Sequence, residues 1–131
     1  MASAIGHQAC SLGYKVMYFN TVKLFSMLKT SKADGSYIKQ INKLEKQDLL
    51  ILNDFGLKGL DNINRHSFME IIEDRHGKKS TIIASLLPVD EWHEIIGEQT
   101  IADAILDRLV HTAHRIDIKG ESMRKKLKNT Q

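Results

Sequence analysis

Cysteine and long apolar runs are scarce in this sequence of 131 residues. With Cys10 as the only cysteine, no internal disulfide can form, which is typical of cytoplasmic proteins. No apolar run approaches the roughly 18 residues that a membrane-spanning helix needs. The first residues lack the charged start and the long apolar run of a signal peptide. We therefore expect a cytoplasmic protein with no part in a membrane.

Motifs of nucleophilic catalysis are also missing. The sequence has no G-x-S-x-G element and no constellation of a nucleophile with a base, which argues against an unrelated small α/β enzyme. Hydrophobic residues make up 42% and charged residues 27% of the chain, as in soluble globular proteins, and the length suits one domain with a real core. The net charge of +3 permits contact with nucleic acid without requiring it.

The most informative stretch is the apolar run from Leu49 to Leu52, which Asn53 and Asp54 follow. So short a run indicates a strand buried on both faces, as in parallel sheets, and not a helix. In an open α/β sheet the carboxyl ends of the strands form the ligand crevice. A carboxylate there suits Mg²⁺ or the positioning of a water. The pattern matches a Walker B element, although an Asp that merely begins a turn gives the same pattern.

Strand and helix patterns alternate along the chain, which predicts a mostly parallel sheet in a three-layer α/β fold. We expect the polar segment 31–35 to be a loop, Thr100 to cap a helix, and Val22 and Ile38 to be buried. The expected strands are 16–19, 49–52, 81–84 and 114–118, and the expected helices begin near residues 2, 21, 36, 63, 89, 101 and 121.

Polar side chains follow three of the predicted strands, namely Asn20, the pair Asn53 and Asp54, and Ser85. Because the carboxyl ends of parallel strands lie along one edge of a sheet, these side chains could share one site.

Two arginines, Arg108 and Arg124, lie on helices predicted late in the chain. Either could be an ordinary surface cation. A phosphate-binding site would give both a role, since guanidinium groups match phosphate oxygens. Arg124 also belongs to a basic C-terminal run, which in isolation indicates a solvated tail.

Five segments occur in a recognisable order: LLILNDFGL at 49–57, IIEDRHGKKSTII at 71–83, LPVDEWH at 87–93, ADAILDRLVH at 102–111 and KGESMRK at 119–125. Together they resemble the IstB family of transposition helper proteins, relatives of the DnaC helicase loaders within the AAA+ ATPases. The resemblance covers nearly the whole chain. It implies residues 1–131 to be part of an AAA+ domain, with the family's strand order 5-1-4-3-2.

The resemblance also implies roles for individual residues. Asn53 and Asp54 occupy the Walker B positions, where the first residue holds Mg²⁺ through water and the second orients the attacking water. Ser85 falls at the sensor-1 position and contacts the γ-phosphate or that water. Arg108 matches the arginine finger, which is given to the neighbouring subunit's nucleotide, and Arg124 matches the sensor-2 arginine.

The family's function is to help a DDE-type transposase choose and capture target DNA. The implied cofactors are ATP and Mg²⁺, and the implied partners are the transposase, double-stranded DNA and further copies of the same chain. ATP controls the assembly of the oligomer on DNA.

The chain departs from the family pattern at three points. It has no G-x-x-x-x-G-K-[ST] loop, whose backbone N–H groups and lysine cradle the phosphates. Asn53 replaces the usual Mg²⁺-holding aspartate, and Leu86 stands where a polar residue is common. The resemblance places Ala2 directly after the missing loop, so it implies either that Met1 is an internal methionine read as a start or that the copy is truncated. The sheet would then be incomplete, without its first, central strand.

Two hypotheses therefore remain. The first is an ATP-dependent transposition helper of the AAA+ type. The alternative is a truncated, non-catalytic remnant or interaction module that does not bind ATP alone, because phosphoryl transfer depends on the positioning that the phosphate loop provides. Whether this chain hydrolyses ATP is left open by the sequence.

Overall fold

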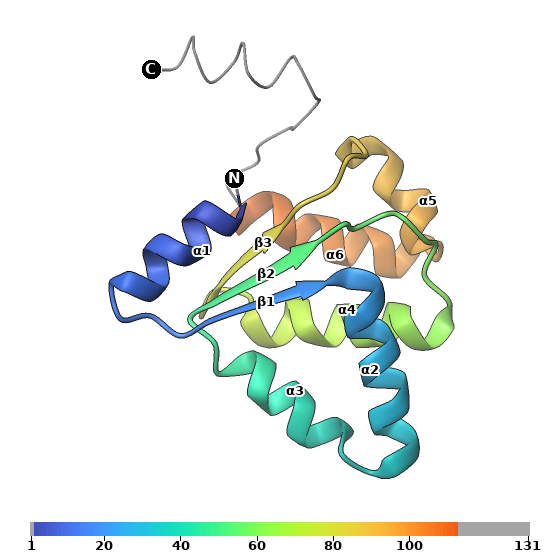
Figure 1. The fold of residues 1–131 in the computed structure, drawn as a ribbon. Coiled ribbons are helices and arrows are strands. Elements are labelled where there is room, and N and C mark those ends of the chain that lie inside the picture. The colour runs from blue at the N-terminus through green and yellow to red at the C-terminus, as the bar shows by residue number, and fades with distance from the viewer. Residues whose placement is uncertain (1, 113–131) are drawn as a thin grey trace, which may run out of the picture.

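Three parallel strands form the sheet at the centre of the fold (Figure 1). The computed structural model describes residues 2–112. Its strands are β1 (Val16–Asn20), β2 (Leu49–Asn53) and β3 (Ser80–Ile83), and they lie in the order β1-β2-β3. In the expected order 5-1-4-3-2, strands 2, 3 and 4 are neighbours, and they correspond to β1, β2 and β3. The observed order therefore agrees with this part of the expected sheet. The strand expected at 114–118 and the helix expected near 121 lie outside the described residues.

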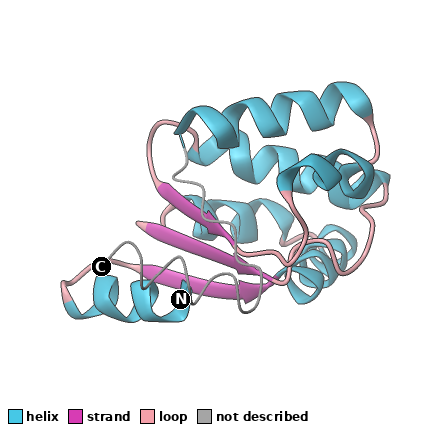
Figure 2. Ribbon diagram, turned by 90° about the horizontal axis from the view of Figure 1, so that it is seen from above, coloured by secondary structure: helices cyan, strands magenta, loops and turns pink. Residues whose placement is uncertain are grey.

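Helices alternate with the strands, as the sequence predicted. They are α1 (Ala2–Ser11), α2 (Thr21–Asp34), α3 (Tyr37–Glu45), α4 (Asn62–Arg75), the short 3-10 helix η1 (Val89–Glu91), α5 (Trp92–Ile96) and α6 (Gln99–Thr112). Figure 2 shows α1 on one side of the sheet and the other helices gathered on the opposite side. The predicted three-layer α/β fold is therefore confirmed. Among the described residues, no helix is long and apolar enough to cross a membrane.

The two faces of β2 are both buried, for different reasons. Leu50 and Leu52 belong to the main core, which α2, α4, α5 and α6 also build. Ile51 points to the other face and is fully buried under α1. The close approach of this helix favours a glycine, because a Cβ added to Gly6 would lie 2.6 Å from Ile51 Cδ1 and would force that side chain to shift. An uninterrupted apolar strand between two helical layers is what the sequence indicated.

Aromatic rings fill the core beside the carboxyl end of β2. Phe55 packs against Phe68 and Trp92, with ring centroids 5.3 Å and 4.7 Å apart. Phe68 also meets Phe25 of α2 edge to face, at 5.9 Å. These contacts join α2, α4 and α5 around the residue that follows Asp54. The core therefore fixes the position of the segment on which the site depends.

Two expectations about helix ends were wrong. Residues 31–34 continue α2, which ends only at Gly35. This glycine has the left-handed φ of 84° and donates its N–H to Ser31 O. Helix α6 begins before Thr100, and Glu98 caps it by accepting from the Ile101 N–H at 2.6 Å.

Val22 and Ile38 are 39% and 72% exposed, although the sequence analysis placed them inside. The buried stripe of α2 runs through Thr21, Leu24, Phe25 and Leu28. That of α3 runs through Ile41 and Leu44, with Tyr37 partly buried. Val22 directly follows Thr21, and Ile38 directly follows Tyr37. Each exposed side chain therefore points about 100° round the helix from the residue before it.

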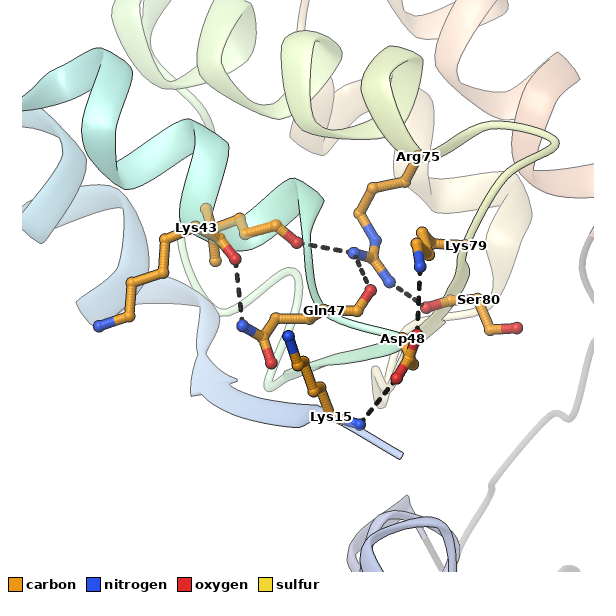
Figure 3. A network of polar contacts seen from close by, with 8 residues as sticks. Lys15, Lys43, Gln47, Asp48, Arg75, Lys79 and Ser80 are labelled. Atoms are coloured by element: carbon orange, nitrogen blue, oxygen red, sulfur yellow. Dashed lines mark hydrogen bonds and ion pairs between the residues drawn. The ribbon is translucent and has the colours of Figure 1, made fainter. Parts of the chain in front are cut away.

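A buried arginine ties the amino ends of β2 and β3 together (Figure 3). Arg75 is only 2% exposed. Its guanidinium donates to Leu44 O at 2.7 Å, to Gln47 O at 2.8 Å, to Thr81 Oγ1 at 2.9 Å and to Ser80 O. Burial lowers the pKa of Arg75 to about 10, against the opposing effect of Asp48, so the group stays charged at neutral pH.

Asp48 completes this polar network at the surface. Its carboxylate accepts from the Lys15 backbone N–H at 2.8 Å and from Lys79 Nζ at 3.1 Å. These two bonds lower the pKa of Asp48. The amino edge of the sheet is thus held by charged side chains that bond to backbone groups.

Candidate functional site

The carboxyl ends of β1 and β2 bring three polar residues together. Asn20 and Asn53 are partners in the parallel register. Asn20 Nδ2 donates to Asp54 Oδ2 at 3.0 Å, and Asn20 Oδ1 caps α2 by accepting from the Lys23 N–H at 3.2 Å. The expected convergence of Asn20, Asn53 and Asp54 is therefore present in the structure.

Thr21 anchors the same edge from the first turn of α2. Its hydroxyl is buried and donates to Asn53 O at 2.6 Å. From the sequence, Thr21 was expected, together with Asn20, only to start a helix, and it was given no role at the site. Together, Asn20 and Thr21 hold both residues of the Asn53–Asp54 pair.

Asp54 adopts a left-handed backbone conformation with φ of 60°, the one positive φ outside glycine among the described residues. Aspartate tolerates this region better than most residues, yet it is uncommon and recurs at functional sites. The chain turns sharply here, and Gly56 follows with φ of 96°. The Asp54 carboxylate is thereby presented at the end of the sheet, not along it.

Ser85 lies just beyond β3, as predicted, but its hydroxyl does not reach Asn53 or Asp54. It donates to Phe55 O and accepts from the Leu87 N–H at 3.1 Å. The neighbouring Phe55 N–H donates to Ala84 O at 3.0 Å. Ser85 therefore joins the loops that follow β2 and β3.

Arg108 lies on α6, far from the carboxyl edge of the sheet. Its guanidinium forms an ion pair with Glu73, near the C-terminal end of α4, and donates to Ala104 O at 2.9 Å. Helix α4 begins after the carboxyl end of β2 and ends beside the amino end of β3, so Glu73 marks the opposite end of the fold (Figure 1). The structure does not bring Arg108 to Asp54 within one chain. Arg124 lies outside the described residues.

A surface cavity of about 170 Å³ opens beside Asp54, between α2 and the loop that leads to α4. Apolar side chains such as Phe25 and Leu60 line it, together with Lys29 and Lys58. Lys29 forms an ion pair with Asp61, the residue that caps α4. This contact lowers the pKa of Asp61 and fixes one wall of the cavity.

The donor set at the sheet edge is that of a hard cation site with few protein ligands. Asp54 offers a carboxylate and Asn53 an amide oxygen, and no group of three or more His, Cys, Asp or Glu residues gathers anywhere in residues 2–112. Mg²⁺ in nucleotide sites is commonly held by one or two carboxylates, waters and substrate phosphates. The residues present fit that pattern and would not form a cage for the metal by themselves.

Comparison with known proteins gives the family. A family profile described as "IstB-like ATP binding protein" matches residues 1–131. The chain belongs to this family. It is 52% identical over 125 residues to a protein of Sinorhizobium fredii named as an insertion sequence ATP-binding protein, y4pL, and this match covers 95% of the chain and 51% of the relative. The IstB-like chain thus spans about half the length of the curated relative.

Solved structures agree with the fold. The IstB-like chain matches DnaI with a TM-score of 0.76 at 19% identity, over 88% of this chain and 63% of that one. It matches the DnaC helicase loader with a TM-score of 0.69 at 22% identity, over 82% and 63%. A structure titled as the replication initiator DnaA with AMPPCP and single-stranded DNA gives 0.72 at 18% identity, over 95% and 39%. The fold is therefore that of the AAA+ P-loop proteins, as predicted.

Proposed function

We propose that the IstB-like chain carries part of the ATP site of an insertion-sequence transposition helper and assists a transposase in selecting target DNA. The observation that supports the ATP site most directly is the 3.0 Å bond from Asn20 to Asp54. It holds a carboxylate in a left-handed turn at the carboxyl edge of β2, where open α/β sheets bind ligands. Membership of a family described as ATP-binding supports ATP as the ligand of this site.

The proposed roles follow from these positions. Asn53 and Asp54 would hold Mg²⁺ through water, and Asp54 would also orient the attacking water. When bound, the metal neutralises charge on the phosphates. The neutral Asn53 contributes an oxygen ligand without a charge, so the site holds the metal less tightly than two carboxylates would.

The arginine finger role suits Arg108 only between chains. Its guanidinium lies at the opposite end of the fold from Asp54 and pairs with Glu73, whose side chain is 43% exposed. Delivery to a neighbouring copy would require that pair to open. We propose the sensor-2 role for Arg124 from the family resemblance alone.

The α2–α3 hairpin supports contact with DNA. Residues 21–46 contain six lysines, no arginine and only two acids, Asp34 and Glu45. Ile38 projects from α3 with 72% exposure. Clustered lysines provide the sequence-independent attraction to phosphates that nucleic-acid binding requires. We also propose that the 131 residues are part of one AAA+ domain, that copies associate on double-stranded DNA, and that the protein acts in the cytoplasm.

An interaction module that does not bind ATP alone is the second candidate. It is favoured by the absence of a G-x-x-x-x-G-K-[ST] loop from the 131 residues. The surfaces for DNA, transposase or further copies would then persist without a complete phosphate cradle.

Calorimetry with Mg²⁺ and ATP separates these two candidates. The chain, checked by circular dichroism to be folded, is titrated beside Asp54→Ala and the exposed control Asp90→Ala. Micromolar binding that Asp54→Ala abolishes and Asp90→Ala retains would support the nucleotide site. No heat of binding in any of the three would contradict ATP binding by this chain and leave the interaction module.

DNA contact is tested by fluorescence anisotropy with double-stranded DNA at several salt concentrations. The double variant Lys39→Gln, Lys43→Gln removes two charges from the hairpin, and Lys78→Gln, Lys79→Gln removes two elsewhere. We expect only the hairpin variant to weaken binding and to reduce the salt slope by about 2. Equal weakening by both variants would contradict a hairpin interface.

A further inference from the structure

The loops that follow β2 and β3 are fastened to each other by Ser85. Phe55 donates its N–H to Ala84 O at 3.0 Å and accepts the Ser85 hydroxyl at its own carbonyl. Ser85 Oγ in turn accepts from the Leu87 N–H at 3.1 Å. We call this set of residues, Phe55, Ala84, Ser85 and Leu87, the loop clasp. A serine hydroxyl has a single proton to donate, and here that proton goes to Phe55.

Gly56, which follows Phe55, lies directly against the side chains of Leu87 and Ser85. A Cβ added to Gly56 would lie 2.7 Å from Leu87 Cδ1 and 3.4 Å from Ser85 Oγ. Gly56 also has φ of 96°, which a residue with a side chain adopts only with strain. The loops after β2 and β3 are therefore packed against each other at Gly56.

Trp92, the only tryptophan of the chain, lies against the loop clasp. Its indole N–H donates to Leu87 O at 3.1 Å, and its ring lies 4.7 Å from the ring of Phe55. Trp92 is 7% exposed. Any loosening of the clasp would change the polarity around this ring, so the protein contains its own spectroscopic reporter.

From these contacts we infer that Ser85 is a positioning residue, which holds the Asp54 turn in place through the carbonyl of Phe55. Phe55 directly follows Asp54, and both of its backbone polar groups bond to the loop after β3. With Phe55 fixed, the left-handed Asp54 directs its carboxylate to Asn20. A substitution that displaced the Ser85 hydroxyl would free the Phe55 carbonyl. The Asp54 carboxylate would then be held less firmly.

This inference rests on the proposed function for its consequence, but not for its test. Three variants are compared in the protein without nucleotide: Ser85→Ala removes the hydroxyl, Ser85→Thr keeps one, and Ser31→Ala removes a buried hydroxyl from α2, away from the loop clasp. Hydrogen exchange of the peptide spanning Asp54 to Leu60 is followed with Trp92 fluorescence.

We expect Ser85→Ala to speed exchange in that peptide about fivefold or more, since one hydrogen bond that holds the loop is lost. Trp92 emission should shift to longer wavelength. Ser85→Thr should restore both readouts, and Ser31→Ala should change neither. Exchange and fluorescence that stay at wild-type values in Ser85→Ala would overturn the inference.

Gly56→Ala provides a second route to the same loops. Its added methyl group meets Leu87, so it should reproduce the faster exchange and the shifted emission while Ser85 is intact. If Gly56→Ala leaves both readouts unchanged, the loops do not act as one unit and the inference fails.

Nucleotide binding then separates this inference from the proposed function. Faster exchange in Ser85→Ala, with no Mg²⁺–ATP binding even by the wild-type chain, would uphold the positioning role and contradict the proposed function. Loss of Mg²⁺–ATP binding in Ser85→Ala with unchanged exchange would mean that the hydroxyl contacts phosphate directly, which would overturn the positioning role.

Discussion

The amino ends of β2 and β3 are held by a buried charged side chain, whereas their carboxyl ends combine unusual backbone conformations with single bonds from neutral side chains. At the amino edge, the buried Arg75 makes four hydrogen bonds, three of them to carbonyl groups. At the carboxyl edge, Asp54 and Gly56 both have positive φ, and single bonds from Asn20 and Ser85 fix the turn. The first edge satisfies buried backbone groups, and the second presents a carboxylate to solvent.

The difference indicates a division of labour along the same strands. The Arg75 charge, which bonds to three backbone carbonyls and to the Thr81 hydroxyl, serves stability, because its removal leaves buried acceptors unpaired. A carboxylate in a strained turn suits the ligand binding proposed for Asp54, since strain of this kind concentrates at functional sites. Variants at the two edges should therefore separate folding from ligand binding.

The largest effect is expected from Arg75→Ala. It leaves the carbonyls of Leu44, Gln47 and Ser80 without their shared donor in a buried position. We expect the free energy of unfolding to fall by about 3 kcal/mol or more. Urea denaturation followed by circular dichroism measures it. A loss below about 1 kcal/mol would mean that water replaces the guanidinium, and that the amino edge is not the stabilising one.

A smaller loss is expected at the carboxyl edge, from Asp54→Val. A β-branched side chain at φ of 60° should cost about 2 kcal/mol. Asp54→Asn is the matched variant, because asparagine tolerates this conformation, and it should change stability by less than about 0.5 kcal/mol. Both should lose Mg²⁺–ATP binding if the site is as proposed. Equal denaturation midpoints for the two variants would argue against strain at Asp54.

Lys79→Ala should have little effect at neutral pH. The Lys79–Asp48 pair is 3.1 Å long, with side chains 38% and 35% exposed. Exposed pairs of this kind contribute about 0.5 kcal/mol or less. The same urea titration compares it directly with Arg75→Ala. A loss as large as that of Arg75→Ala would show that the surface of the network matters as much as its buried part.

The smallest effect is confined to acid and concerns Asp48. The Lys15 N–H and Lys79 hold its folded pKa below the ordinary value of 3.8. The contribution of Asp48 to folding stability is therefore fully present above the ordinary pKa, which applies to the unfolded chain. It is lost as the pH falls through the lower folded pKa. In Asp48→Asn this contribution is absent, so stability should fall less steeply than in wild type between about pH 4 and about pH 2. Parallel curves would contradict a lowered pKa.

Local patterns in the sequence were sufficient for the elements and their order. The apolar run 49–52, the Asn-Thr helix start and the alternation of strands with helices predicted β2, α2 and the parallel sheet, because each depends on neighbours in the chain. Errors arose where the buried face of a helix begins one residue earlier than the apolar pattern suggested. Val22 and Ile38 are exposed because Thr21 and Tyr37 begin the stripes instead.

Long-range bonds decided the rest. The sequence predicted Asn20, Asp54 and Ser85 at strand ends. Only the packed loops reveal that the Ser85 hydroxyl donates to Phe55 O, while the Asn20 amide donates to the Asp54 carboxylate. Arg75 carried no sequence signal, since its acceptors lie on α3, on the segment before β2 and on β3. What each side chain can donate is fixed by its type, but which acceptor lies within 3 Å is set by the folding of distant segments onto one another.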